Sequence, residues 1–156
     1  MVSPHNPFKE EENLLPDQLR LKMMQLAIGQ DPRFALSAVE FTLPKPSYTI
    51  DTLTHLSQKY PDREFIILMG SDGLPTFDRW KDHELITERY HRYIYPRHGD
   101  EDLDYSMHKN ITLLKDAPRF ELSSTFVRQA LADGKNIRHL VPDKVYNYIT
   151  NNRLYQ

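Results

Sequence analysis

The chain has 156 residues, a formal net charge of −2 and no cysteine, so one domain with a real hydrophobic core is expected. The balanced charge argues against a general nucleic-acid or membrane-surface binder, and the lack of thiols excludes disulfides, thiolate metal sites and cysteine nucleophiles. No run reaches the ~18 apolar residues of a membrane span, and no basic-then-apolar leader is present, so a cytoplasmic protein is the default expectation.

Apolar periodicity, prolines and glycines predict a chain in which helices and strands alternate. Met1–Ser3 resembles the end of a strand, and the prolines after it favour an extended segment over residues 4–9. In chain order, we expect a helix at 16–28, a strand at 34–41, a helix at 51–60, a strand at 64–69, a helix at 83–89, strands at 90–95 and 111–114, and helices at 126–132 and 144–151.

Strands that alternate with helices predict the α/β class, with a right-handed, doubly wound parallel sheet in a single domain over residues 1–156. The run 64–69 is continuously apolar, which is typical of a strand buried on both faces of such a sheet. Ligands of these sheets bind outside the carboxyl ends of the strands. Segments 3–9, 70–72, 97–99 and 123–128 are all expected at that edge, which makes it the candidate site.

The residues Gly70, Ser71 and Asp72 follow the apolar strand directly. The glycine would let a ligand approach the backbone, and the carboxylate could accept hydrogen bonds from two ribose hydroxyls. A simple turn with an aspartate cap explains the same residues. Trp80, the only tryptophan, could stack on a flat ligand or cover the edge of the core.

A second candidate site begins at Ser123, where two serines and a threonine precede a helix. Free backbone N–H groups, the positive end of the helix dipole and three hydroxyls would converge there on a phosphate. Arg128, one turn into the helix, could clamp phosphate oxygens with two parallel hydrogen bonds. An ordinary capped helix with a surface arginine remains the alternative.

The common catalytic motifs are absent from the sequence. The seven histidines show no metal-ligand spacing, the carboxylates form no pair in an apolar setting, and there is no P-loop, Gly-x-Gly-x-x-Gly or Gly-x-Ser-x-Gly element. We therefore identify no catalytic residue and no metal site.

Five segments taken together resemble the bacterial nicotinate mononucleotide adenylyltransferase family, part of the nucleotidyltransferase superfamily with a Rossmann-like fold. They are Pro46–Leu53 with its Pro-Ser-Tyr-Thr, Phe65–Asp72 with its Gly-Ser-Asp, Trp80, Leu122–Arg128 with its Ser-Ser-Thr, and the tail Leu140–Tyr155. The resemblance implies adenylyl transfer from ATP to nicotinate mononucleotide, giving nicotinate adenine dinucleotide and pyrophosphate in NAD biosynthesis. It also implies small-molecule nucleotides as partners and Mg²⁺ carried by the ATP phosphates, and it leaves a homo-oligomer open.

The resemblance also implies roles for individual residues. The residues that would bind the nicotinate nucleotide are Tyr48, Thr49, Trp80 and Lys9. Thr49 would lie near the pyridine carboxylate, and Trp80 would stack on the ring. The residues that would bind ATP are Gly70, Asp72, Ser123, Ser124, Thr125 and Arg128. The first two would hold a ribose, and the other four would bind the phosphates.

Three features depart from the family pattern. Lys81 stands where the family has a tyrosine, and could pair with a carboxylate or a phosphate; His98 stands where the family has a proline. The family's first strand, its loop with His-x-Gly-His and the helix after it do not occur, so the sheet is expected to be incomplete at the N-terminus. The chain is then either part of a longer product or a degenerate relative, and a non-catalytic nucleotide-binding or truncated α/β domain is the alternative function.

Overall fold

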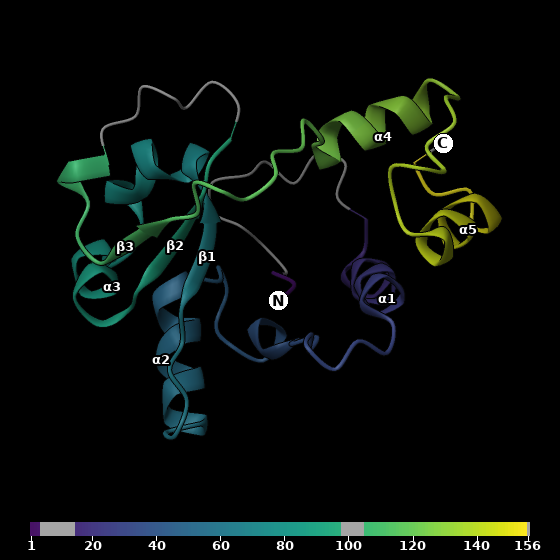
Figure 1. Cartoon of the computed structure of the whole chain (residues 1–156). Coiled ribbons are helices and arrows are strands. Elements are labelled where there is room, and N and C mark those ends of the chain that lie inside the picture. The colour runs from purple at the N-terminus through teal and green to yellow at the C-terminus, as the bar shows by residue number, and fades with distance from the viewer. Residues whose placement is uncertain (4–14, 98–104, 156) are drawn as a thin grey trace. The chain divides into compact units, whose positions relative to one another are not determined.

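The computed structural model describes residues 1–3, 15–97 and 105–155 (Figure 1). The chain divides into two compact units, which are described separately below. Unit 1 consists of Met1–Thr42 and Leu122–Gln156, and unit 2 is the segment Leu43–Glu121. No helix in the described part of the chain combines the length and apolar character that crossing a membrane requires.

Unit 2 contains a three-stranded parallel sheet in the order β1-β2-β3 (Figure 1). Its elements are α2 (Thr49–Lys59), β1 (Ile67–Gly70), the 3-10 helix η2 (Ser71–Arg79), α3 (His83–Arg89), β2 (Arg92–Tyr95), the 3-10 helix η3 (Tyr105–Met107) and β3 (Ile111–Leu113). The register places Ile67 opposite Arg92, and Arg92 opposite Ile111. The predicted α/β class with a parallel sheet is confirmed.

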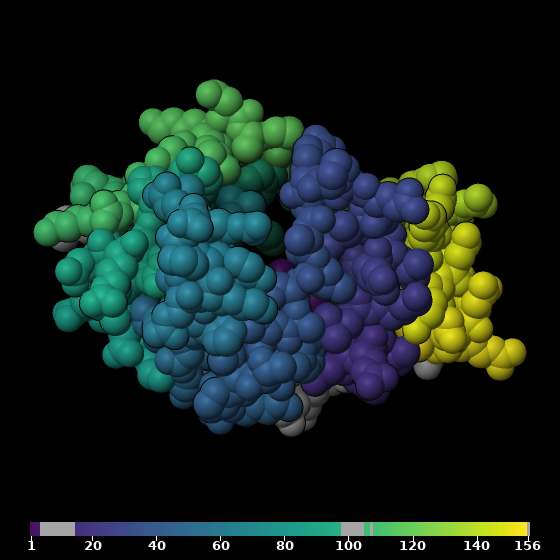
Figure 2. Space-filling model, turned by 90° about the horizontal axis from the view of Figure 1, so that it is seen from below, coloured from purple at the N-terminus to yellow at the C-terminus, as the bar shows by residue number. Residues whose placement is uncertain are grey.

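The core of unit 2 forms where α2, η2 and α3 pack together beside the sheet. Its buried members are Ile50, Leu53, Phe77, Ile86 and Tyr90. The apolar stripe of α2 supplies the first two, and the opposite face of this helix lies at the surface (Figure 2). This packing fixes the start of α2, and with it the Tyr48 and Thr49 backbone.

Among the described residues of unit 2, one charged side chain is fully buried. Arg92 is 0% exposed and its guanidinium carbon lies 4.1 Å from the centroid of the Phe77 ring. Its Nη2 donates to the Lys109 carbonyl at 2.6 Å, whereas Nε and Nη1 have no hydrogen-bond partner in the part of the chain that the structure describes. Burial lowers the pKa of the Arg92 guanidinium, because the surroundings disfavour its charged form.

We expect the Arg92→Met substitution to leave the free energy of unfolding unchanged or to raise it by about 1–2 kcal/mol. An apolar chain of similar length removes the desolvated charge and its two unpartnered nitrogens, at the loss of one hydrogen bond and the contact with Phe77. Arg92→Ala should instead destabilise by about 2–4 kcal/mol, because it also leaves a hole in the core. Urea unfolding of the three proteins measures both effects, and equal destabilisation by Met and Ala would contradict the expectation.

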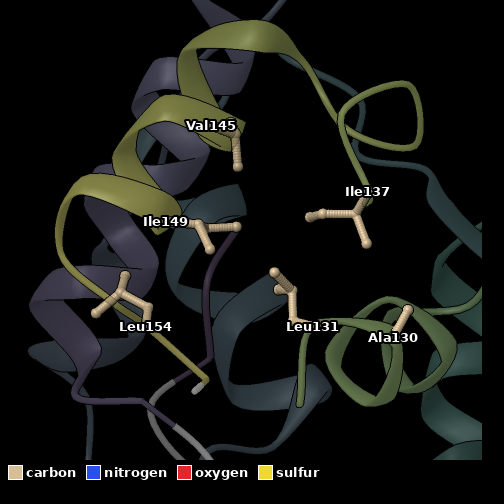
Figure 3. Packing of buried hydrophobic residues seen from close by; sticks show 6 residues of the cluster. All are labelled: Ala130, Leu131, Ile137, Val145, Ile149 and Leu154. Carbon is tan, nitrogen blue, oxygen red and sulfur yellow. The ribbon is translucent and has the colours of Figure 1, made fainter. Parts of the chain in front are cut away.

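Unit 1 contains three α-helices among its described residues. They are α1 (Asp17–Ile28), α4 (Ser124–Ala132) and α5 (Asp143–Asn151); a short 3-10 helix, η1 (Val39–Phe41), follows α1. Gly29 has a φ of +62°, which ends α1 as the sequence predicted. The core comprises Ala130, Leu131, Ile137, Val145, Ile149 and Leu154 (Figure 3). Ile137, in the connection between α4 and α5, points toward Ile149 on α5 (Figure 3).

Two strand predictions need correction. No strand forms at 34–41, where Phe34 is 61% exposed and the structure instead has η1. An alternating pattern makes a strand only if a neighbouring backbone pairs with it, and among the described residues the pairing is one hydrogen bond from Val2 N to Ser37 O. The strand predicted at 64–69 is shorter, beginning at Ile67, and the prediction of burial on both faces was wrong because Leu68 is 69% exposed.

Candidate functional site

The carboxyl ends of β1 and β2 are joined by a short polar contact. The backbone N–H of Arg97 donates to Ser71 Oγ at 2.7 Å, and Ser71 is fully buried. A Cβ at position 70 would displace the Asp72 carboxylate from its present place and would lie 3.5 Å from Arg97 Cγ, so the glycine allows the carboxylate to lie against the backbone. The exposed Asp72 carboxylate therefore turns back over the Gly70 backbone, and both predicted residues lie together at this edge.

A second group of predicted residues surrounds the start of α2. Tyr48 is the residue before the helix, Thr49 is its first residue, and Tyr48 and Trp80 both pack against the core of unit 2. The Trp80 ring lies 5.4 Å from the Phe77 ring, tilted by 47°. The N-cap residue of α2, Tyr48, makes no side-chain capping hydrogen bond, and among the described residues the buried Ser47 hydroxyl has no partner. Backbone N–H groups at such a helix start can donate to a ligand.

Lys81 completes this second group, and the sequence did not reveal its partner. Its ammonium Nζ lies 2.9 Å from Oδ2 and 3.0 Å from Oδ1 of Asp51. The same Nζ stands 4.8 Å from the centroid of the Tyr48 ring. Hydrogen bonding to Asp51 raises the pKa of Lys81, so this lysine is firmly protonated at neutral pH.

The predicted phosphate-binding residues lie at the start of α4 in unit 1. Ser123 caps the helix, its Oγ accepting from the Phe126 N–H at 3.1 Å, as the capping alternative predicted. Arg128 Nη2 donates to Thr125 Oγ1 at 3.2 Å, so the guanidinium does reach back toward the helix start. Ser124 and Thr125, the first two residues of α4, are exposed.

A cavity of about 330 Å³ opens beside this helix start. Ser123, Ser124 and Arg128 line its polar side, and Tyr155 and several apolar residues complete it. Burial raises the pKa of the Tyr155 phenol, and the positive charges of Arg128 and Arg20 oppose this shift. Sequence reasoning assigned no role to Tyr155; its membership in the family-like tail was the one available signal.

The described residues of the predicted site are divided between the two units. Tyr48, Thr49, Gly70, Asp72 and Trp80 belong to unit 2, and Ser123, Ser124, Thr125 and Arg128 belong to unit 1. Lys9, His98 and Gly99 lie outside the described residues. A larger cavity of about 800 Å³ in unit 2, lined by Phe77, His83 and Arg92 among others, includes none of the predicted site residues. Within the described ranges, no three His, Asp or Glu side chains are placed to hold a metal ion.

Comparison with known proteins decides the family. Residues 1–130 match the cytidylyltransferase-like family. A "Probable nicotinate-nucleotide adenylyltransferase" of Flavobacterium johnsoniae is 45% identical over 158 residues, which cover 100% of this chain and 81% of that protein. A protein of the same name from Bacteroides fragilis is 50% identical over 149 residues, covering 96% of this chain and 74% of its own.

The chain belongs to the nicotinate-nucleotide adenylyltransferase family. Its fold agrees: the Plasmodium falciparum nicotinic acid mononucleotide adenylyltransferase complexed with NaAD superposes with a TM-score of 0.74 at 18% identity, covering 99% of this chain and 80% of that one. The Rossmann-like nucleotidyltransferase fold expected from the sequence is thus confirmed. In this adenylyltransferase, the carboxyl edge of the sheet, the start of α2 and the start of α4 are the places where nucleotide contacts are expected.

Proposed function

We propose that this protein transfers the adenylyl group of ATP to nicotinate mononucleotide in NAD biosynthesis. The observation that carries the proposal is its identity of 45–50% with named nicotinate-nucleotide adenylyltransferases over almost the whole chain. The geometry supports it, because aromatic rings beside an uncapped helix suit a pyridine ring with its carboxylate. An arginine and hydroxyls at the start of α4 suit a polyphosphate.

The reaction needs no nucleophile from the protein. A phosphate oxygen of nicotinate mononucleotide attacks the α-phosphorus of ATP and forms the new P–O bond. The bond from that phosphorus to the bridging oxygen breaks, and its electron pair leaves on pyrophosphate. Catalysis is then positioning plus stabilisation of negative charge, which fits a sequence that has no acid–base pair.

Each group of residues has a part in this proposal. Tyr48, Thr49 and Trp80 bind the pyridine end of nicotinate mononucleotide, and Lys9 belongs to the same nucleotide's contacts. Gly70 and Asp72 hold the ribose of ATP, and the Asp72 carboxylate accepts hydrogen bonds from its hydroxyls. Ser123, Ser124, Thr125 and Arg128 bind the ATP phosphates, with Arg128 the cation nearest their negative charge.

Mg²⁺ is proposed to enter bound to ATP, with phosphate oxygens as its main ligands. Magnesium commonly keeps several waters and binds through substrate phosphates with one or two carboxylates. Asp72 is the carboxylate among the proposed ATP-binding residues. The cation would supply further charge stabilisation at the phosphates. Small-molecule nucleotides as partners and a cytoplasmic location are part of the same proposal.

The alternative is a domain that binds nucleotides without turning them over. Calorimetric titration with ATP and with nicotinate mononucleotide, followed by a pyrophosphate-release assay with both, separates the two. Release that requires both nucleotides supports the enzyme. Binding without release would favour the alternative function, and absence of binding to either nucleotide would contradict both.

Trp80 provides a direct signal for the pyridine site. Because it is the only tryptophan, its fluorescence should change on addition of nicotinate mononucleotide and change little with ATP alone. Titrations in which ATP is added before or after the mononucleotide measure the fluorescence change that each nucleotide causes. An unchanged spectrum at saturating mononucleotide would leave Trp80 as a residue that only covers Phe77 at the edge of the core.

A further inference from the structure

Lys81 lies among residues that are proposed to bind the pyridine ring, although it departs from the family pattern at that position. It follows Trp80 directly, and its Nζ lies 4.8 Å from the centroid of the Tyr48 ring. Its counter-charge, Asp51, is in the first turn of α2, two residues after Thr49. One cation is thus fixed between the two segments that would contact the pyridine end of the substrate.

The ion pair with Asp51 leaves this cation available. The Lys81 and Asp51 side chains are 43% and 40% exposed, and an exposed ion pair of this kind contributes little to stability. An ammonium has three N–H donors, and the described contacts with Asp51 engage both oxygens of a single carboxylate. A second carboxylate can therefore be bound beside Asp51, or in exchange for it, at small cost.

We propose that Lys81 binds the pyridine carboxylate and selects nicotinate mononucleotide over its amide, nicotinamide mononucleotide. This inference rests on the proposed function and assigns one specificity-determining residue within it. The two substrates differ only in whether the ring carries a charged carboxylate or a neutral amide. A fixed ammonium attracts the first and gains no ionic interaction with the second, so the preference follows from charge.

Asp51 has a defined part in the same proposal. Its carboxylate holds the ammonium beside Tyr48 but also competes with the substrate carboxylate and repels it. Asp51→Asn keeps the size and a hydrogen-bonding oxygen while removing this charge. The substitution should therefore strengthen the binding of the acid relative to the amide, opposite in direction to removing the lysine.

The test is calorimetric measurement of the dissociation constants of both mononucleotides for the parent protein and four variants. Lys81→Met should weaken binding of the acid by about tenfold or more, the usual loss for a charged hydrogen bond, and leave the amide within about twofold. Lys81→Arg should keep most of the preference. Lys59→Met is the matched control, because Lys59 also lies over a tyrosine ring, 5.4 Å from Tyr60, at the far end of α2.

The outcomes separate this inference from the proposed function. If the parent prefers the acid and Lys81→Met loses that preference while Lys59→Met retains it, the inference is supported. If the parent prefers the acid and the ratio of the two dissociation constants is the same in Lys81→Met, the inference is overturned and the proposed function still stands. An equal loss of both ligands would make Lys81 a structural residue, and a parent that binds neither nucleotide would overturn the function and the inference together.

Discussion

Ile137→Ala is expected to lower the free energy of unfolding by about 2–5 kcal/mol, among the largest stability effects available in this chain. Ile137 is 0% exposed and lies in the core of unit 1, facing Ile149 and close to Leu131 (Figure 3). Removing its branched side chain loses the transfer free energy of three methyl or methylene groups and leaves a cavity. The neighbouring side chains come mainly from the packed helices α4 and α5, so the gap can close only in part.

Urea unfolding followed by far-ultraviolet circular dichroism measures this loss. Leu140→Ala is the matched control, since Leu140 lies three residues later in the same connection and is 36% exposed, and should cost less than about 1 kcal/mol. Equal losses in the two variants would show that Ile137 does not anchor the core.

The same experiment tests the proposal that residues 1–156 form one domain. Trp80 lies in unit 2, whereas Ile137 lies in unit 1, so tryptophan fluorescence reports on a unit that the substitution does not touch. A cooperative domain unfolds in one transition, and the fluorescence midpoint should then shift together with the circular dichroism midpoint. If the circular dichroism midpoint shifts and the fluorescence midpoint does not, the two units unfold independently.

The helices could be predicted well because their signals are local. The bounds of α3, His83–Arg89, agree with the prediction residue for residue, and α1 ends at the predicted glycine. A helix satisfies its own backbone hydrogen bonds, so periodicity and capping residues in one short window contain most of the information. The 3-10 helix η2 was not predicted: the sequence suggested a turn at residues 70–72 and no element over residues 74–79, and Pro75 in its middle argues against an α-helix.

The contacts of the candidate site could be predicted only in part. The sequence placed Gly70 and Asp72 after an apolar strand and Arg128 one turn into a helix, and both placements rest on local patterns. The ion pair of Lys81 with Asp51 joins residues 30 positions apart, and the packing of Arg92 on Phe77 depends on how η2 covers the sheet. Such contacts depend on tertiary structure, for which a single sequence contains no local signal.

Arg128→Ala should weaken ATP binding by about 10- to 100-fold, the largest functional effect that we expect from one substitution. The Arg128 guanidinium lines the cavity beside the start of α4 and already reaches Thr125, so it is held toward the place where phosphate would bind. Losing one charge-assisted, bidentate contact with phosphate costs roughly 1.5–3 kcal/mol. Arg128→Lys should recover only part of this, because an ammonium keeps the charge but not the planar fork.

Calorimetric titration of ATP into the parent, Arg128→Ala, Arg128→Lys and Arg138→Ala measures the effect. Arg138 is the matched control: it lies in the same unit, is exposed, and its Nε stands 3.9 Å from the Asp143 carboxylate rather than beside the α4 hydroxyls. Its loss should change ATP affinity by less than about twofold. Higher salt should weaken binding by the parent more than binding by Arg128→Ala, because an ionic contact is screened. Equal affinities of parent and Arg128→Ala would remove Arg128, and with it the proposed phosphate site at the start of α4, from ATP recognition.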